Sequence, residues 1–200
     1  HKDRVRRVMF APDGRTAFSA ASDSRVIEWD VETGQNIHTY VGHLATVYAV
    51  VNLPNNRILS GSSDGTIRIW DTINGAQIQR LDGHINIVYT VALSPDGRQA
   101  LSGGQDRQVI LWDLETGQPI YTFSGHADGI RGVAFSPDGK TALSTSRDTT
   151  LILWDLETGQ AIRTFNGHDD VVWGVAFSPD GKTALSGSWD GTLILWDIET

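Results

Sequence analysis

Short apolar runs, each followed by a turn, recur along the chain. The clearest unit runs from Gly167 to Asp197. It holds an apolar run at residues 171–177, the turn Ser-Pro-Asp-Gly at residues 178–181, a second run that ends at Ser186, and a third run at residues 193–196. Runs of this length that are rich in Val, Ile and Leu and bounded by turn residues predict β-strands and not helices. Proline presets such a turn, and glycine accepts the positive φ that the turn requires.

The unit is repeated, and five copies account for the chain. A Trp-Asp pair recurs at steps of 41, 42, 42 and 42 residues, and a histidine precedes each tryptophan by 27 or 28 residues. The copies span residues 1–42, 43–83, 84–125, 126–167 and 168–200. Three turns divide a copy into four strands: A (residues 172–177 in the last copy), B (ending at Ser186), C (residues 193–196) and D (residues 120–123 in the third copy). The chain stops before a strand D of the last copy.

Gly-His and Trp-Asp pairs that bracket four short strands, at a period near 42 residues, resemble the WD-repeat β-propeller family. The resemblance covers the whole chain. With its nearly identical copies, the chain is similar to amplified propellers of bacteria. It implies an all-β fold, a β-propeller of four-stranded antiparallel blades with five repeats present. Propellers of this family commonly have about seven blades. We therefore expect a segment of a larger ring, or a ring that another chain closes.

Composition excludes several other classes of protein. With 40% apolar residues and a net charge of −8, the chain suits a globular domain, and it has no cysteine for disulfides or thiolate metal sites. No apolar run approaches the ~18 residues of a membrane span. The negative charge opposes nonspecific binding to nucleic acid, and the phosphate-binding glycine patterns of nucleotide enzymes are absent. We expect a cytoplasmic protein without a cofactor, a bound metal, a nucleic-acid partner or a membrane partner.

Each copy carries a histidine, a serine and an aspartate that could be mistaken for a catalytic triad. The sets are His1, Ser19 and Asp23; His43, Ser60 and Asp64; His84, Ser102 and Asp106; His126, Ser144 and Asp148; and His168, Ser186 and Asp190. A hydrolase needs one such set, whereas here every copy has one, always accompanied by the tryptophan of Trp-Asp. The family resemblance implies a structural tetrad in which Asp, His, Ser and Trp are joined by hydrogen bonds. We therefore predict that the protein is not an enzyme, and the hydrolase stays as a less favoured alternative.

Two residues of the first copy depart from the pattern. Glu28 occupies a position of an apolar face where the other copies have Ile or Leu. A buried carboxylate without a partner is costly, so either a partner group neutralises Glu28 or this blade is loosely packed. His38 is the one histidine outside the five sets, and we expect it at the surface or in packing and not as a ligand.

Differences between the copies indicate where a partner binds. The last copy matches the fourth at 25 of 33 aligned positions, and most differences fall at the start of strand A or in the B–C turn. In an up-and-down blade these two segments lie at the same end, which we call the variable rim. The opposite end carries the constant Pro-Asp-Gly and Trp-Asp-x-Glu-Thr-Gly turns. Variation confined to one end predicts that this end contacts a partner.

The variable rim is rich in Tyr, Trp and Arg, the side chains that dominate binding hot spots. The candidate partner-binding residues are Arg4, Arg6, Tyr48, Ile87, Tyr89, Gln105, Arg131, Arg147, Val171, Trp173 and Trp189. Trp173 and Trp189 weigh most, because they are the two tryptophans outside the Trp-Asp pairs. Arginine beside aromatic residues predicts an acidic or phosphorylated peptide. We predict a non-catalytic scaffold for protein interaction; the alternative is a structural segment that forms a homo-oligomer, or gains further blades, to close the ring.

Overall fold

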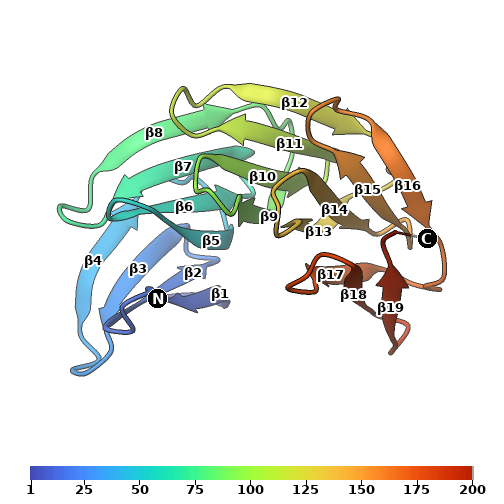
Figure 1. The fold of residues 1–200 in the computed structure, drawn as a ribbon. Helices are drawn as coiled ribbons and strands as arrows, with labels where there is room; N and C mark the ends of the chain where they lie inside the picture. The colour runs from blue at the N-terminus through green and yellow to red at the C-terminus, as the bar shows by residue number, and fades with distance from the viewer. Residues whose placement is uncertain (200) are drawn as a thin grey trace. The chain divides into compact units, whose positions relative to one another are not determined.

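The computed structural model describes residues 1–199, which form nineteen β-strands in five antiparallel sheets (Figure 1). We call each sheet a blade. The first two blades contain β1 (Val5–Phe10), β2 (Thr16–Ala21), β3 (Arg25–Asp30) and β4 (Asn36–Val41), then β5 (Val47–Leu53), β6 (Arg57–Ser62), β7 (Thr66–Asp71) and β8 (Gln77–Asp82). The third contains β9 (Val88–Leu93), β10 (Gln99–Gly104), β11 (Gln108–Asp113) and β12 (Pro119–Ser124). The fourth contains β13 (Ile130–Phe135), β14 (Thr141–Ser146), β15 (Leu151–Asp155) and β16 (Ala161–Phe165), and the fifth contains β17 (Val172–Phe177), β18 (Thr183–Ser188) and β19 (Leu193–Asp197).

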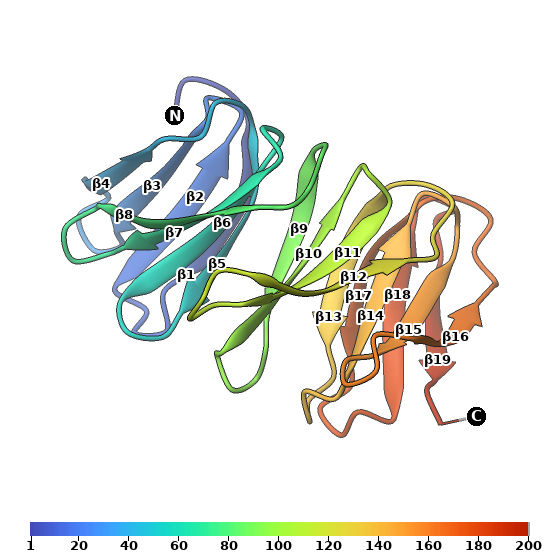
Figure 2. The same ribbon diagram turned by 90° about the horizontal axis from the view of Figure 1, so that it is seen from above.

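The strands of each blade lie side by side in chain order and are twisted, as Figure 2 shows. This confirms the prediction of four-stranded antiparallel blades for the first four copies, and β17 has the predicted bounds of strand A. Strand B of the fifth blade extends past Ser186, because Gly187 still pairs with Leu193. Within residues 1–199, the fifth sheet has three strands and no helix could span a membrane.

Apolar cores form where the face of one blade packs on the next. The chain divides after Val91 into two compact units. In the first unit, a core between the first two blades includes Phe18, Val26, Tyr40, Val47 and Trp70. In the second unit, one core joins the third and fourth blades, and another joins the fourth and fifth. We call the face of a blade that meets the following blade its trailing face, and the opposite one its leading face.

Glu28 is buried and has partners on the neighbouring strand. It is 5% exposed, the Tyr40 hydroxyl donates a hydrogen bond of 2.6 Å to its Oε2, and His38 Nδ1 lies 3.1 Å from the same oxygen. Burial, reinforced by the bond to Glu28, raises the pKa of Tyr40 far above its ordinary value. The face of this blade that meets the second blade is closed, since Phe18 is 2% exposed. Glu28 therefore has partner groups, as the first of the two expectations required, and His38 is one of them.

Tight turns hold the strands in register through residues with positive φ. Gly181 in the Pro-Asp-Gly turn has φ of 74°, and Asn55 and Asn56 take over this role in the second blade with φ of 60° and 54°. The B–C turns need the same conformation after the tetrad aspartate. Gly191 supplies it at 83° in the fifth blade, but the fourth blade uses Thr149 at 72°. A β-branched residue in this region is strained.

We expect the Thr149→Gly variant to be more stable than the wild type by about 1 kcal/mol, because it relieves a left-handed conformation that costs ~1–2 kcal/mol for an L-residue but adds some entropy to the unfolded chain. Urea unfolding of the two proteins measures the difference. The reverse change, Gly191→Thr in the matching turn, should destabilise by a similar amount. A lower stability of Thr149→Gly would contradict the strain.

Candidate functional site

The His, Ser, Asp and Trp of the fourth blade form one continuous hydrogen-bond chain. The indole Nε1 of Trp154 donates to Ser144 Oγ over 2.8 Å, and Ser144 Oγ lies 2.8 Å from His126 Nε2. His126 Nδ1 lies 2.8 Å from a carboxylate oxygen of Asp148. Because an indole can only donate and a carboxylate can only accept, the protons are ordered: the serine hydroxyl donates to Nε2, and Nδ1–H donates to the aspartate.

The same chain is present in three other blades. The corresponding residues are His1, Ser19, Asp23 and Trp29; His43, Ser60, Asp64 and Trp70; and His168, Ser186, Asp190 and Trp196, with contacts of 2.7–3.0 Å. In the third blade, Trp112 donates to Ser102 over 2.8 Å. Each tetrad connects the segment before strand A, strand B, the B–C turn and strand C. The tetrad predicted from the resemblance is therefore present in these four blades.

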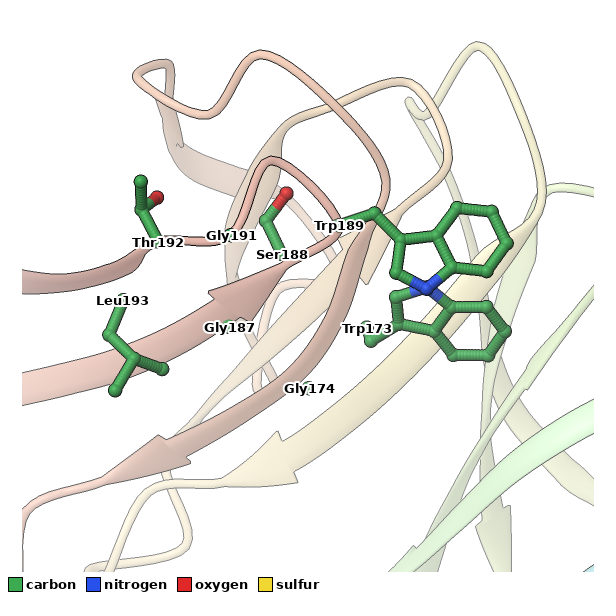
Figure 3. A pocket seen from close by; sticks show the side chains of 8 residues that line it. All are labelled: Trp173, Gly174, Gly187, Ser188, Trp189, Gly191, Thr192 and Leu193. Carbon is green, nitrogen blue, oxygen red and sulfur yellow. The ribbon is translucent and has the colours of Figure 1, made fainter.

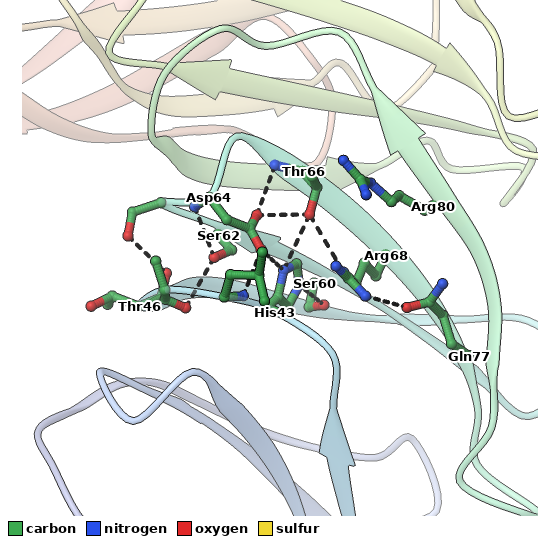
Figure 4. A network of polar contacts seen from close by, with 12 residues as sticks. His43, Thr46, Ser60, Ser62, Asp64, Thr66, Arg68, Gln77 and Arg80 are labelled. Carbon is green, nitrogen blue, oxygen red and sulfur yellow. Dashed lines mark hydrogen bonds and ion pairs between the residues drawn. The ribbon is translucent and has the colours of Figure 1, made fainter.

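The tetrad of the second blade shows how completely the carboxylate is bound (Figure 4). Asp64 accepts hydrogen bonds from the Leu44 backbone N–H at 2.9 Å and from the Thr66 hydroxyl at 2.7 Å, besides its contact with His43. Burial alone would raise the pKa of Asp64, but the hydrogen bonds from His43, Leu44 and Thr66 outweigh it and hold the pKa far below its ordinary value. Burial lowers the pKa of His43 despite the neighbouring carboxylate, and the charge of Arg68 adds to the effect.

Burial also explains why the serine of a tetrad is a poor nucleophile. Ser60 and Ser144 are 0% exposed and Ser186 is 1% exposed. Each of these hydroxyls accepts a hydrogen bond from an indole N–H and donates one to the histidine, so a substrate carbonyl has no free side from which to approach. The geometry fits a structural tetrad and not a catalytic triad. Among residues 1–199, no three His, Asp or Glu side chains gather in a way that could hold a metal ion.

In the first, second, fourth and fifth blades the two variable segments meet at one end, as predicted. The backbone N–H of Trp189 in the B–C turn donates to the carbonyl of Val171, just before strand A, over 3.0 Å. Arg147 makes the same bond to Gly129 in the fourth blade, again over 3.0 Å. The tetrad aspartate accepts from the backbone of this segment as well, as Asp190 does from Asp169 at 3.0 Å. The variable rim is thus fixed by hydrogen bonds that recur from blade to blade beneath it.

In the first unit, three of the candidate residues form a row of side chains in contact. The guanidinium of Arg6 lies 5.4 Å from the ring centroid of Tyr48, within the range of a cation–π contact. Tyr48 and Tyr89 meet edge to face with centroids 5.2 Å apart. Arg6 Nε also donates to Ser22 Oγ over 2.9 Å, and Arg4 is exposed beside it in sequence. The successive blades of this unit therefore contribute side chains to one surface.

In the second unit, Trp173 and Trp189 lie against each other at the rim of the fifth blade (Figure 3). Their ring centroids are 5.0 Å apart, and the side chains are 41% and 65% exposed. The guanidinium of Arg131, from the fourth blade, lies 5.1 Å from the Trp173 ring. An open hollow of about 440 Å³ adjoins the pair and is also lined by Gly174, Gly187 and Leu193. The strongest sequence candidates are thus brought together on an accessible surface.

The remaining candidate residues differ in exposure. Val171 is 6% exposed, so its side chain is buried. Gln105 is half-buried, with its amide 3.1 Å from the position that a Cβ on Gly129 would take. Ile87 and Tyr89 are half-buried, whereas Arg147 is exposed.

Two acidic residues of the rim were not among the candidates predicted from the sequence. Asp169 and Asp170 are exposed and place negative charge in the segment just before β17. Their position directly after a tetrad histidine was the sequence feature that could have indicated them.

We expect His126→Ala to lower the melting temperature, because it removes one hydrogen-bond partner from each of Ser144 and Asp148, and a buried polar group that loses a partner costs roughly 1–3 kcal/mol. Differential scanning calorimetry checks this change. Lys140→Ala, at an exposed turn of the same blade, is the matched control and should change the melting temperature little. An unchanged melting temperature in His126→Ala would argue against a structural tetrad.

The fold should lose stability in acid. The pKa of Asp148 is held low because the bond to His126 and other hydrogen bonds exceed the effect of burial, and Thr192 lowers that of Asp190. A carboxyl with a lowered folded pKa contributes stability above its unfolded pKa of 3.8 and loses it as the pH falls. His43, lowered from 6.5 by burial, acts in the same direction below that pH, since the unfolded chain takes up its proton first.

Urea unfolding over a pH series should therefore show a free energy of unfolding that decreases below pH 6.5 and decreases more steeply below pH 3.8. The Asp64→Asn variant should be less stable at neutral pH and show a shallower loss in acid, because its side chain does not titrate. A stability that stays constant down to about pH 3 would rule out this contribution of the tetrads.

Comparison with known protein families identifies the repeats. The family described as WD domain, G-beta repeat, matches residues 1–30, 34–71, 75–113, 117–155 and 159–197, so each matched stretch ends on the aspartate of a Trp-Asp pair. Among curated proteins, the chain is similar to the probable E3 ubiquitin ligase complex SCF subunit sconB of Arthroderma otae, with 46% identity over 54 residues. The corresponding Neurospora crassa protein, scon-2, is 41% identical over 54 residues.

A third relative is the eukaryotic translation initiation factor 3 subunit I of Pyricularia oryzae, which is 32% identical over 60 residues. These alignments cover 27–30% of this chain and 8–18% of the relatives' own length. Each alignment is a little longer than one repeat, so it relates a stretch of the chain and not whole proteins. The family match, by contrast, extends over most of the chain and coincides with its blades and tetrads. The chain belongs to the WD-repeat family.

Proposed function

We propose that the protein is a non-catalytic scaffold that binds a protein or peptide at its variable rim. The observation that carries the proposal is the exposed pair Trp173 and Trp189, whose rings are 5.0 Å apart. Large aromatic side chains contribute much binding energy, and rings that already support each other lose little freedom on binding. The pair therefore offers a prepared surface for an apolar side chain.

The packing of a blade does not require these tryptophans. The position of Trp189 is occupied by Ser22, Ser63, Gln105 and Arg147 in the other blades, which fold into the same arrangement of strands. The position of Trp173 carries Arg6, Tyr48, Tyr89 and Arg131. A side chain that the blade tolerates in such different forms, and that leaves a large ring in water, is better explained by contact with a partner than by stability.

The charges near the pair favour a peptide that carries an acidic or phosphorylated residue. Arg131 and Arg147 lie on the rim of the fourth blade, and arginine binds carboxylates and phosphates well because its donors form a planar fork. Asp169 and Asp170 repel negative charge on the fifth blade. We place the apolar side chain of the peptide on the tryptophans and its acidic group beside the fourth blade. The net charge of −8 disfavours nucleic acid as the partner.

The names of the relatives agree with an interaction role. The relatives from Arthroderma otae and Neurospora crassa are named as probable subunits of an SCF ubiquitin ligase complex, and the one from Pyricularia oryzae is named as a subunit of a translation initiation factor. Each is thus named as a part of a multiprotein assembly. A rigid platform for a protein partner is the role that we carry over to this chain.

We expect the double variant Trp173→Ala and Trp189→Ala to bind at least about tenfold more weakly, because it removes the aromatic surface on which the peptide rests. The wild type is first used to select ligands from a library of acidic and phosphorylated peptides, and fluorescence anisotropy then gives the affinity of each variant. Arg147→Glu should weaken the same ligands by charge repulsion.

The double variant Asp180→Ala and Lys182→Ala is the matched control, because it alters an exposed turn at the opposite end of the same blade. It should bind like the wild type. Unchanged affinity of the tryptophan variant, with its circular dichroism intact, would refute the site; weaker binding by both double variants would show that the effect is not confined to the rim.

A further inference from the structure

A polar pair replaces an apolar one where the trailing face of the first blade meets the leading face of the second. Between the fourth and fifth blades, Leu153 and Phe177 take part in one apolar core. The corresponding positions at the first interface hold Glu28 on β3 and Asn52 on β5. Leucine and phenylalanine also occupy these positions between the third and fourth blades, where they pack in the core: Leu111 and Phe135. Polar residues at both places therefore distinguish the first interface from these two.

The polar pair lines a hollow of about 400 Å³ at the end of the blades opposite the variable rim. Two exposed turns form its mouth, at residues 12–13 of the first blade and 54–56 of the second, and Phe18 and Leu53 add apolar walls. A hollow of about 520 Å³ lies at the same end between the fourth and fifth blades, but the acidic residues that line it are all exposed: Asp138, Asp180 and Glu199. Of the two hollows, the first alone is lined by a buried carboxylate.

Glu28 has one oxygen bound and one oxygen available. The side chain is buried, and both of its hydrogen-bond partners, Tyr40 and His38, contact Oε2. Within residues 1–199, no donor and no ion-pair partner contacts Oε1, yet this atom is not sealed off from solvent. A carboxylate has about four acceptor sites, and a buried charge is costly unless it is paired. Oε1 therefore leaves an acceptor with negative charge in the wall of the hollow.

The other groups of the hollow add acceptors and little positive charge. Asn52 Nδ2 donates to the carbonyl of Phe10 over 2.8 Å, so its Oδ1 is the amide atom left to accept a bond. Asp13 adds a second carboxylate at the exposed mouth. Arg57 also lines the hollow, but its Nε donates to the carbonyl of Pro54 over 3.1 Å, and in the described part of the chain it forms no ion pair. The hollow is thus the complement of a cationic donor.

A basic side chain suits this hollow better than a metal ion. No three His, Asp or Glu side chains of residues 1–199 gather into a set of metal ligands. An ammonium or guanidinium group carries several N–H donors and forms strong, charge-assisted hydrogen bonds with a carboxylate. The stems of lysine and arginine cover apolar surface while their charged ends reach polar groups. The combination of apolar walls with an available carboxylate oxygen matches both parts of such a side chain.

We propose that the hollow between the first and second blades binds a basic side chain, arginine or lysine, of a partner protein. The cationic end bonds to Glu28 Oε1 and Asn52 Oδ1, and the stem lies against Phe18 and Leu53. The side chain enters between the two exposed turns. This is a second binding site at the end opposite the variable rim, and it does not depend on the peptide-binding function proposed above.

Nuclear magnetic resonance titration of the ¹⁵N-labelled protein tests this site. The probes are N-acetyl-arginine methylamide and N-acetyl-lysine methylamide, and the readout is the side-chain amide signal of Asn52. At least one probe should give a saturable shift with a Kd of roughly 1 mM, since a single side chain binds weakly. The tighter of the two probes identifies the side chain. N-acetyl-norleucine methylamide has an apolar stem and no charge, so it should not shift this signal.

Two variants separate the site from a general effect of charge. Glu28→Gln keeps an acceptor for Tyr40 but removes the charge, so it should weaken the basic probe by about tenfold or more. Glu32→Gln is the matched control, because it removes the same charge from an exposed turn of the same blade, outside the hollow; it should bind like the wild type. Asn52→Leu restores the residue type of Leu93 and should also weaken binding, because it removes an acceptor and adds an apolar group.

Three results would overturn the proposal: a wild type without a saturable shift up to ~10 mM probe, a norleucine probe that binds as well as the basic probes, or unchanged affinity in Glu28→Gln and Asn52→Leu. Circular dichroism establishes that each variant is folded. Trp173 and Trp189 are intact in all of them, and the double variant of these tryptophans should bind the basic probes like the wild type. Failure of this site therefore leaves the function of the variable rim to its own test.

Discussion

The buried hydrogen-bond chain from tryptophan to aspartate is the interaction on which each blade depends. It joins the segment before strand A, strand B, the B–C turn and strand C, which are up to 28 residues apart in sequence. All members are largely buried, so each polar atom must find its partner inside the blade. The lowered pKa of Asp64, Asp148 and Asp190 reflects how many donors converge on the carboxylate.

This anchoring explains how one end of a blade can vary while the fold is kept. The tetrad aspartate holds the B–C turn and the start of strand A by backbone and side-chain bonds. The side chain next to that aspartate lies outside the tetrad, and the copies use serine, glutamine, arginine or tryptophan there. The paired tryptophans of the fifth blade are one outcome of this variation. A catalytic interpretation has no comparable explanation, because the serines are closed off by the same bonds.

A second constraint is the packing of one blade face on the next. Each blade presents leucine, isoleucine or valine on both faces, because both are covered wherever another blade adjoins. The same composition is present in the first and fifth blades, where two of these faces are uncovered. Repetition thus gives the chain matching apolar surfaces as a direct result of copying one unit. The copies also tolerate local exceptions, such as Glu28, when a neighbouring strand offers tyrosine and histidine.

The sequence by itself determined the strands, the turns and the tetrads, because these follow from local periodicity and from spacings that recur in every copy. It also located the variable rim, since connections at the same end of an up-and-down sheet must lie together. Only the tertiary structure decided which rim residues are accessible: Val171 is buried, while Trp173 and Trp189 lie against each other with both rings partly exposed. Likewise, the leucines of the fourth and fifth blades are the same in sequence and differ in exposure. Burial depends on what packs against a residue, and its own sequence does not record its neighbour.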